Sequence, residues 1–162
     1  MIYFIVGSTG AGKTRYAIEL AKERGAIRFA IDDWMSTLFF PDLKGEISFD
    51  WAMERINRCE EQIWKLTRAI VATGQEVILE ISLSTRELRD KQRGIAQEAG
   101  IDYQIHYLDV DRETRRKRVL ERNQSRGETW FFDVDDGMFD FVEQMFEPPS
   151  TQELQGAVLI RE

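Results

Sequence analysis

A run of eight residues near the start of the chain has the composition and spacing of a phosphate-binding loop. The run consists of Gly7, Ser8, Thr9, Gly10, Ala11, Gly12, Lys13 and Thr14. Its three glycines leave backbone N–H groups free to turn inward around phosphate oxygens. The lysine can reach the β- and γ-phosphates, and the threonine hydroxyl can bind Mg²⁺. A strand-like segment before the run and a helix-like segment after it argue against a chance match. The loop therefore predicts binding of a nucleoside triphosphate, ATP or GTP, with Mg²⁺.

Two adjacent carboxylates, Asp32 and Asp33, follow a short apolar segment and are candidates for acceptor chemistry. In an open α/β sheet, ligands bind beyond the carboxyl ends of the strands, which is where this pair is expected to lie. A carboxylate there can accept the proton of a hydroxyl that attacks the γ-phosphate. We expect Asp32 to be this base and Asp33 to contact the substrate. The two roles could be exchanged, and capping of the next helix is the structural alternative.

A third carboxylate, Glu80, ends the apolar run 77–79 and resembles a Walker B acid. Such an acid holds Mg²⁺ through water or orients a basic substrate contact. Arg86 lies just beyond it and is a candidate for binding substrate or phosphate, with a solvated surface charge as an equal alternative. Arg89, on the same predicted helix, is expected to be a solvated surface charge.

Seven basic residues are concentrated between positions 112 and 126. Arg115, Arg118 and Arg122 recur at three- and four-residue steps, so they share one face of a predicted helix, and Arg126 follows in a turn. Guanidinium groups on one face suit the charge of a transferring phosphoryl group. We predict an arginine-bearing lid at about 112–130, with Arg122 and Arg126 catalytic and Arg118 at the nucleotide. A solvated basic face is the alternative.

The hydrophobic pattern predicts the elements that must bring these residues together. Apolar runs that alternate with helical segments are typical of parallel strands joined by right-handed crossovers. We therefore predict an α/β fold, a three-layer P-loop domain with about five parallel strands that spans 1–162 as one domain. The expected strands are 2–6, 26–31, 76–81, 103–108 and 157–160, and the expected helices are 15–22, 34–39, 50–73, 85–99, 113–123 and a segment after 133.

Composition limits the partners that the chain is expected to have. Its 22 basic and 29 acidic residues give a net charge of −7, which is unfavourable for binding long nucleic acid. The basic segment still leaves a nucleic acid partner open. No apolar run approaches the roughly 20 residues that span a bilayer, and no secretory signal is evident. Cys59 and His106 are the only residues of their types and are expected to be buried structural side chains. A single cysteine is typical of a cytoplasmic protein.

With these motifs placed, the whole chain resembles the zeta-toxin and polynucleotide-kinase-like P-loop kinases, especially small bacterial predicted kinases of that group. Besides the phosphate loop, the shared motifs are Ile-Asp-Asp-Trp-Met at 31–35, Ile-Leu-Glu at 78–80, Tyr-Leu-Asp-Val at 107–110, Arg-Val-Leu-Glu-Arg-Asn at 118–123 and Phe-Glu-Pro-Pro at 146–149. The resemblance implies a nucleoside-kinase-like fold and transfer from ATP or GTP to a hydroxyl. It also implies that Asp32 is the base and that Arg122 and Arg126 lie in the lid. The family usually has aspartate where this chain has Glu80.

We expect a Mg²⁺-dependent kinase that phosphorylates a small hydroxyl-bearing molecule. The aromatic residues Trp34, Phe39 and Phe40, close to Asp32 in the sequence, could wall an apolar acceptor pocket together with aromatic residues between 130 and 146. A 5′-hydroxyl polynucleotide kinase is the second hypothesis, for which the basic segment is the evidence. A nucleotide-dependent switch or partner-binding ATPase is the third. The sequence leaves the acceptor, the choice between ATP and GTP, and the oligomeric state open.

Overall fold

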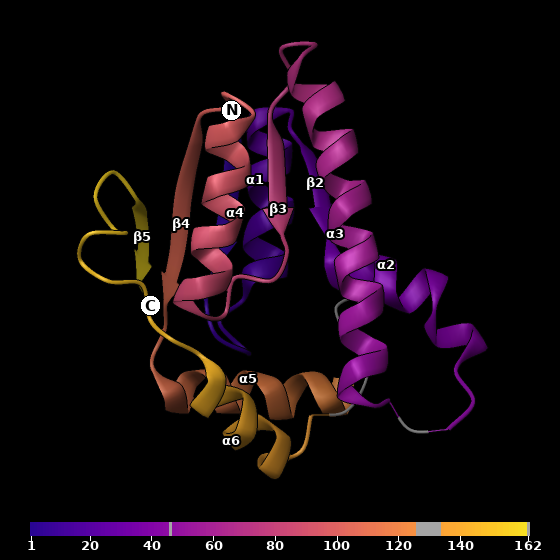
Figure 1. Cartoon of the computed structure of the whole chain (residues 1–162). Helices are drawn as coiled ribbons and strands as arrows, with labels where there is room; N and C mark the ends of the chain where they lie inside the picture. The colour runs from indigo at the N-terminus through magenta and orange to yellow at the C-terminus, as the bar shows by residue number, and fades with distance from the viewer. Residues whose placement is uncertain (46, 126–133, 162) are drawn as a thin grey trace.

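A five-stranded parallel sheet runs through the middle of the molecule (Figure 1). The computed structural model describes residues 1–45, 47–125 and 134–161. The sheet has the order β2-β3-β1-β4-β5, and every neighbouring pair of strands is parallel. The strands are β1 (Ile2–Val6), β2 (Ile27–Ala30), β3 (Val77–Glu80), β4 (Tyr103–Asp109) and β5 (Val158–Arg161). This architecture confirms the predicted α/β P-loop fold with five parallel strands.

Helices cover both faces of the sheet and its carboxyl edge. They are α1 (Lys13–Arg24), α2 (Ile31–Leu38), α3 (Phe49–Val71), α4 (Arg86–Glu98), α5 (Arg112–Ser125) and α6 (Asp136–Met145), with a short 3₁₀ turn at Phe40–Asp42. In Figure 1, α3 and α4 lie in front of the sheet, α1 lies behind it, and α5 and α6 lie below the tips of the strand arrows. The last two helices therefore face the edge where parallel sheets bind ligands.

The strand β1 forms the centre of the core because both of its faces are buried. Successive side chains of a strand point to opposite faces, so Ile2, Phe4 and Val6 pack with residues of α3 and α4. Tyr3 and Ile5 pack on the other face with residues of α1. The fully apolar strand therefore holds the start of the phosphate loop rigidly in place.

The helix α2 begins three residues earlier than the sequence predicted. Its N-cap is Ala30, the last residue of β2, and no side chain caps it. Asp32 and Asp33 therefore lie in the first helical turn, where the helix dipole stabilises negative charge. The alternative that one of these aspartates is the N-cap is wrong, because the strand turns directly into the helix.

The segment that follows α6 returns across the molecule to the start of α4. Glu147 accepts a hydrogen bond from the Arg86 backbone N–H at 2.7 Å, and Glu153 lies against Arg89. This contact fixes the C-terminal segment before it enters β5. Among the described residues, no helix is long and apolar enough to cross a membrane.

Candidate active site

The phosphate loop leaves β1 and runs directly into α1. Gly10 and Gly12 have positive φ angles of 79° and 90°, a left-handed conformation that favours glycine. A Cβ atom on Gly10 would lie 2.5 Å from the Arg115 carbonyl oxygen, so the loop also packs directly on α5. Gly12 is the N-cap of α1 and has no side chain to bind the first N–H groups of the helix. Those groups are the ones that bind anions at helix N-termini.

The two side chains that end the loop already make contacts within the protein. The Lys13 Nζ atom donates to the Ser8 carbonyl oxygen at 3.1 Å. The Thr14 hydroxyl donates to Glu80 Oε1, also at 3.1 Å. Burial lowers the pKa of Lys13, although the nearby Asp32 and Glu80 carboxylates oppose that effect. The loop thus places a cation and a hydroxyl in the wall of one cavity.

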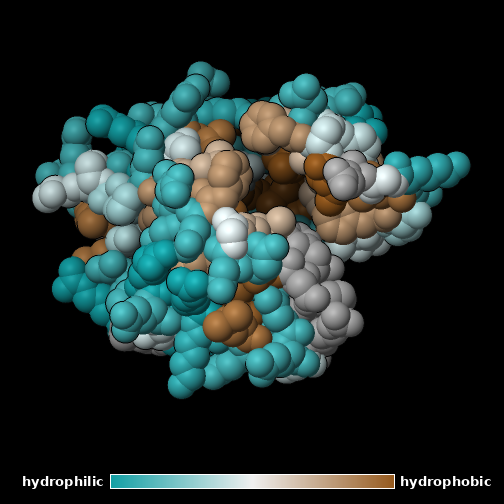
Figure 2. Space-filling view, turned by 90° about the horizontal axis from the view of Figure 1, so that it is seen from below, coloured by the Kyte–Doolittle hydropathy of each residue, from teal (hydrophilic) through white to brown (hydrophobic). Residues whose placement is uncertain are grey.

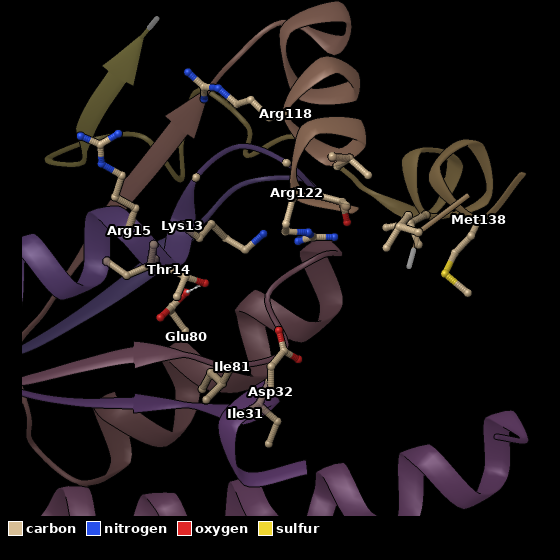
Figure 3. Close-up of a pocket in the computed structure, with 17 residues that line it drawn as sticks. Lys13, Thr14, Arg15, Ile31, Asp32, Glu80, Ile81, Arg118, Arg122 and Met138 are labelled. Carbon is tan, nitrogen blue, oxygen red and sulfur yellow. Dashed lines mark hydrogen bonds between the residues drawn. The ribbon is translucent and has the colours of Figure 1, made fainter. Parts of the chain in front are cut away.

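This cavity has a volume of about 430 Å³ and brings together residues from several elements. Lys13, Asp32 and Arg122 all line it, from α1, α2 and α5 respectively. Figure 3 shows the Lys13 and Arg122 side chains pointing toward one another, with Asp32 facing them from across the cavity. The surrounding protein raises the pKa of Asp32, although its side chain is still exposed to solvent, while the charges of Lys13 and Arg122 act in the opposite direction.

Glu80 is held by an arginine that the sequence analysis did not identify. Arg28 on β2 donates from Nε to Glu80 Oε2 at 2.5 Å and from NH1 to Asp33 Oδ2 at 2.9 Å. Burial raises the pKa of Glu80, and the Arg28 charge opposes this increase. A lone arginine in a four-residue strand gives no sequence signal, because its partners are fixed only when β2 pairs with β3.

The structure separates the two adjacent aspartates. Asp32 lines the cavity, whereas Asp33 is turned toward Arg28 and is absent from the described residues of the cavity wall. Asp33 is therefore a partner of Arg28 in this structure. Its predicted contact with substrate is not supported by its position.

The three arginines predicted to share one helix face have different surroundings. Arg115 is buried and donates to both carboxylate oxygens of Glu143 on α6, at 2.5 and 2.7 Å. Arg118 lines the cavity and donates to the Ala11 carbonyl oxygen at 3.4 Å. The Nε atom of Arg122 is buried and has no hydrogen-bond partner among the described residues. Arg126 lies outside the described residues.

A second depression of about 640 Å³ adjoins the cavity on the other side of the phosphate loop. The depression and the cavity have four lining residues in common, namely Gly12, Arg15, Arg118 and Arg122. Its remaining lining includes Tyr16 of α1, together with residues of α5 and β5. In Figure 3 the Arg15 and Arg118 side chains point toward β5, away from Asp32. The site therefore has two connected compartments, one on either side of the loop.

The described residues of the cavity wall include neither Arg86 nor Arg89, the two arginines that follow Glu80 in the sequence. Arg86 is 64% exposed and lies 3.7 Å from Asp90. Arg89 was expected to be a solvated surface charge, and that prediction is wrong because the side chain is only 1% exposed. It donates to Glu153 at 2.7 Å and to the Glu147 carbonyl oxygen at 2.7 Å. The C-terminal segment, distant in the sequence, covers it.

The aromatic residues beside Asp32 do not form the described wall of the cavity. Trp34 packs edge-to-face on Phe29, with ring centroids 6.2 Å apart, and Phe39 lies against the Arg55 guanidinium. Phe40 belongs to the 3₁₀ turn. The predicted partners at 130–132 lie outside the described residues. The apolar lining instead comes from aliphatic residues and methionine, namely Ile5, Ile31, Ile81, Val119, Val134, Met138 and Val142.

The oxygen atoms of Thr14 and Glu80 are suitable ligands for a magnesium ion bound with a nucleotide. A hydroxyl and a carboxylate lie together in the cavity, and Mg²⁺ prefers oxygen ligands. Within the described ranges, no group of three His, Cys, Asp or Glu side chains could hold a metal ion. Such sparse protein ligation is usual when phosphates and water complete the coordination of Mg²⁺.

Comparison with known proteins identifies a family and several related folds. The family model described as "AAA domain" matches residues 2–149. A candidate kinase from Chloroflexus aurantiacus has a TM-score of 0.71 and 15% identity, over 99% of this chain and 83% of that one. Kti12 from Chaetomium thermophilum, in complex with ADP-AlF3, has a TM-score of 0.70 and 13% identity, over 100% and 88% of the two chains.

A third solved structure is the APS kinase CysC of Mycobacterium tuberculosis in complex with AMPPNP and APS. Its TM-score is 0.60 at 18% identity, over 99% of this chain and 87% of that chain. Identities this low show a shared fold. No curated protein sequence matches the chain. The narrower resemblance to zeta-toxin kinases stays a prediction.

Proposed function

The chain belongs to the AAA domain family, and on that premise we propose that it is a kinase. It would transfer the γ-phosphoryl group of ATP, with Mg²⁺, to a hydroxyl of a small molecule. The observation that carries this proposal is the arrangement in the cavity, where Lys13 and Arg122 converge from two helices and Asp32 faces them. Residues suited to binding the transferred phosphate therefore lie on one side of the cavity, and a residue suited to accepting the proton of a hydroxyl lies on the other.

The donor side supplies positive charge and hydrogen-bond donors. Lys13 and the N-terminus of α1 would bind the β- and γ-phosphates. Arg122 contributes an Nε–H that has no partner among the described residues, a donor suited to a phosphoryl oxygen. The depression beside Arg15 and Arg118 is where the nucleoside would extend from the loop. The ADP-AlF3 and AMPPNP complexes of two similar folds support a nucleotide here, with GTP as the alternative to ATP.

Thr14 would bind Mg²⁺ directly, and Glu80 would accept a hydrogen bond from water in its coordination sphere. Bound Mg²⁺ neutralises charge on the phosphate oxygens. Arg28 keeps the buried Glu80 carboxylate oriented by holding its other oxygen. The longer glutamate side chain, in place of the usual aspartate, reaches both Thr14 and Arg28.

The acceptor side is built around Asp32. The acceptor hydroxyl would transfer its proton to the Asp32 carboxylate as its oxygen forms a bond to the γ-phosphorus. The bond from that phosphorus to the leaving nucleoside diphosphate breaks in the same displacement. A raised pKa makes Asp32 a stronger base than an aspartate at its ordinary pKa, and Lys13 and Arg122 favour its ionised form. Arg126 stays a predicted lid residue.

The described part of the lid helix offers little support for a polynucleotide acceptor. Arg115 is buried against Glu143, Arg112 pairs with Asp140, and Arg116 pairs with Asp136. These cations are balanced by acidic residues of α6, so the concentration of charge seen in the sequence does not form a broad basic surface there. A small acceptor is the better supported hypothesis.

The test is product formation by matched aspartate variants. The protein is incubated with γ-labelled ATP and a metabolite extract, and mass spectrometry identifies any phosphorylated compound. Asp32→Asn is expected to reduce transfer by about 10²–10⁴-fold while nucleotide binding persists. Asp33→Asn should keep most of the transfer, since Asp33 faces Arg28.

Two outcomes contradict the proposal. Full transfer by Asp32→Asn would remove the general base from the mechanism. ATP hydrolysis that a protein partner stimulates, with no phosphorylated small molecule in any extract, would instead support the switch or ATPase hypothesis.

A further inference from the structure

The cavity wall near Asp32 is apolar. Ile31 and Ile81 lie beside Asp32, and Met138 of α6 lies on another side of the cavity (Figure 3). Val134 and Val142 complete this part of the lining. Figure 2 views the molecule from the side of α5 and α6 and shows a hollow with strongly hydrophobic residues in its interior. The space in front of the candidate base therefore favours an apolar ligand surface.

The positive charges in the cavity wall belong to the donor side. Among the described lining residues the cations are Lys13, Arg15, Arg118 and Arg122. The last three also line the adjoining depression, and Lys13 contacts the phosphate loop itself. A bound triphosphate would therefore engage these charges.

Arg28, whose charge also acts on Asp32, is already paired with two protein carboxylates. Arg28 is largely buried and binds Glu80 and Asp33 with separate nitrogen atoms. Among the described residues of the wall, the charged group that remains in front of the apolar part is the Asp32 carboxylate. An anionic acceptor would meet that like charge with no cation of its own among the residues described.

We propose that the acceptor is an uncharged small molecule that carries its hydroxyl on an apolar body. This inference rests on the proposed kinase function and names the acceptor class for the same site. Transfer of an anion into an apolar site without a partner is strongly unfavourable, so a carboxylate or phosphate near the reacting hydroxyl is excluded. The cavity of about 430 Å³ would also hold the γ-phosphate end of the nucleotide, so the space left for the acceptor suits a small molecule.

A matched pair of alcohols tests the inference by binding. The probes are 1,4-benzenedimethanol and 4-(hydroxymethyl)benzoate, which share a hydroxymethyl group and ring and differ in charge at the far end. Their affinities are measured by calorimetry on the full chain saturated with a Mg²⁺-bound non-hydrolysable ATP analogue. The uncharged alcohol is expected to bind at least about tenfold more tightly. Equal or tighter binding of the benzoate, or no binding of the dimethanol, would overturn the inference.

Two methionines of α6 provide matched variants. Met138 and Met145 are each 43% exposed, but only Met138 is among the described residues of the cavity wall. Met138→Lys places a cation there and is expected to shift preference toward the benzoate by about tenfold, whereas Met145→Lys should leave it unchanged. Met138→Gln, which is polar and uncharged, should retain the preference for the uncharged alcohol. Equal shifts in both lysine variants would contradict the proposed location.

A measurement of phosphoryl transfer distinguishes failure of this inference from failure of the proposed function. With labelled ATP, transfer to the benzoate but not to the dimethanol would overturn the acceptor class while supporting a kinase. Tight binding of the dimethanol with no transfer would contradict the kinase function while supporting the uncharged character of the cavity. A 5′-hydroxyl oligonucleotide that displaces the dimethanol and becomes labelled would overturn the inference in favour of a polynucleotide acceptor.

Discussion

Asp32, Lys13 and Arg122 come from three different helices, yet their side chains interact in one cavity. The position of each is set by a short-range cause. Lys13 follows a left-handed glycine, Asp32 lies in the first turn after a strand, and Arg122 lies near the end of α5. At this scale, function depends on which side chains already have partners. Arg115 donates to both carboxylate oxygens of Glu143, whereas the buried Nε of Arg122 has no partner in the part of the chain that the structure describes.

Arg122 is therefore expected to matter for transfer more than its neighbours on α5. Arg122→Met should lower kcat by at least about 100-fold, because a preorganised donor to the transferring phosphoryl group is lost. Nucleotide affinity should change much less. The matched control is Arg116→Met, since Arg116 pairs with Asp136 at the surface and lies outside the described cavity wall. Steady-state kinetics and nucleotide titration measure both effects. Comparable losses in the two variants would contradict the role of Arg122.

At the scale of elements, α5 and α6 form one unit that rests on the phosphate loop. Asn123 exchanges two hydrogen bonds with the backbone of Val134, just before α6, and Arg112 pairs with Asp140 in α6, so both ends of α5 are linked to this segment. Glu143 of α6 also accepts a hydrogen bond from the Ser8 hydroxyl at 3.2 Å. The helices α5 and α6 and the phosphate loop are thus in direct contact.

A second element-scale contact joins the C-terminal segment to α4. Arg89 and Glu153 are 1% and 3% exposed and form a buried ion pair. Burial tends to raise the pKa of Glu153, but hydrogen bonds from Arg89 and Ser150 outweigh it and lower the pKa to about 2. The stabilising effect of this carboxylate should therefore persist at neutral pH. It should be lost only as the pH falls from about 4.5 toward 2.

Glu153→Gln is expected to reduce the free energy of unfolding by about 3–5 kcal/mol, because Arg89 is left buried and unpaired. Urea unfolding measures the change, and Glu98→Gln, at an exposed position of α4, is the control. The double variant Arg89→Met with Glu153→Leu should recover much of the loss, since it removes both charges together. A loss below about 1 kcal/mol in Glu153→Gln would show that the pair is not important for stability.

At the scale of the whole molecule, the order of the strands places the candidate site residues at one edge of the sheet. The phosphate loop follows the central strand β1, Glu80 ends its neighbour β3, and Asp32 follows β2 on the far side of β3. The helix α5 follows β4, on the other side of β1. Parallel strands deliver all of these chain segments to the same edge.

His106 on β4 is buried, and burial lowers its pKa from 6.5 to about 4. Its Nδ1 atom lies 2.7 Å from the Tyr16 hydroxyl, and its Nε2 atom lies 3.2 Å from Gln104 Oε1. Because the folded pKa is below the unfolded one, the unfolded chain takes up a proton first as the pH falls. The free energy of unfolding should therefore decrease between about pH 6.5 and 4, by up to about 3 kcal/mol from this residue.

His106→Gln should flatten this part of the pH dependence, because glutamine does not titrate. Chemical unfolding at several pH values compares the slopes of the variant and the original chain. The effect of Glu153 lies at lower pH, so the two contributions are distinguishable. Parallel slopes from pH 6.5 to 4 would contradict the assignment.

The sequence alone was enough to predict the phosphate loop, the parallel α/β fold and the approximate limits of every strand. These features depend on local spacing and on the periodicity of apolar residues, both of which can be read directly from the sequence. The candidate roles of Lys13 and Asp32 were also accessible, because each is tied to a motif at a strand end. The roles themselves stay predictions until transfer is measured.

Tertiary structure decided which of these side chains are available to a ligand. Asp32 and Asp33 are adjacent in the sequence, but Arg28 binds only Asp33. Arg89 has the local setting of a surface charge, yet Glu153 covers it from 64 positions away. Burial and charge pairing depend on distant segments that the fold brings together, so local patterns do not contain them. The phosphate loop identifies the nucleotide side of the site, and long-range packing determines what faces it.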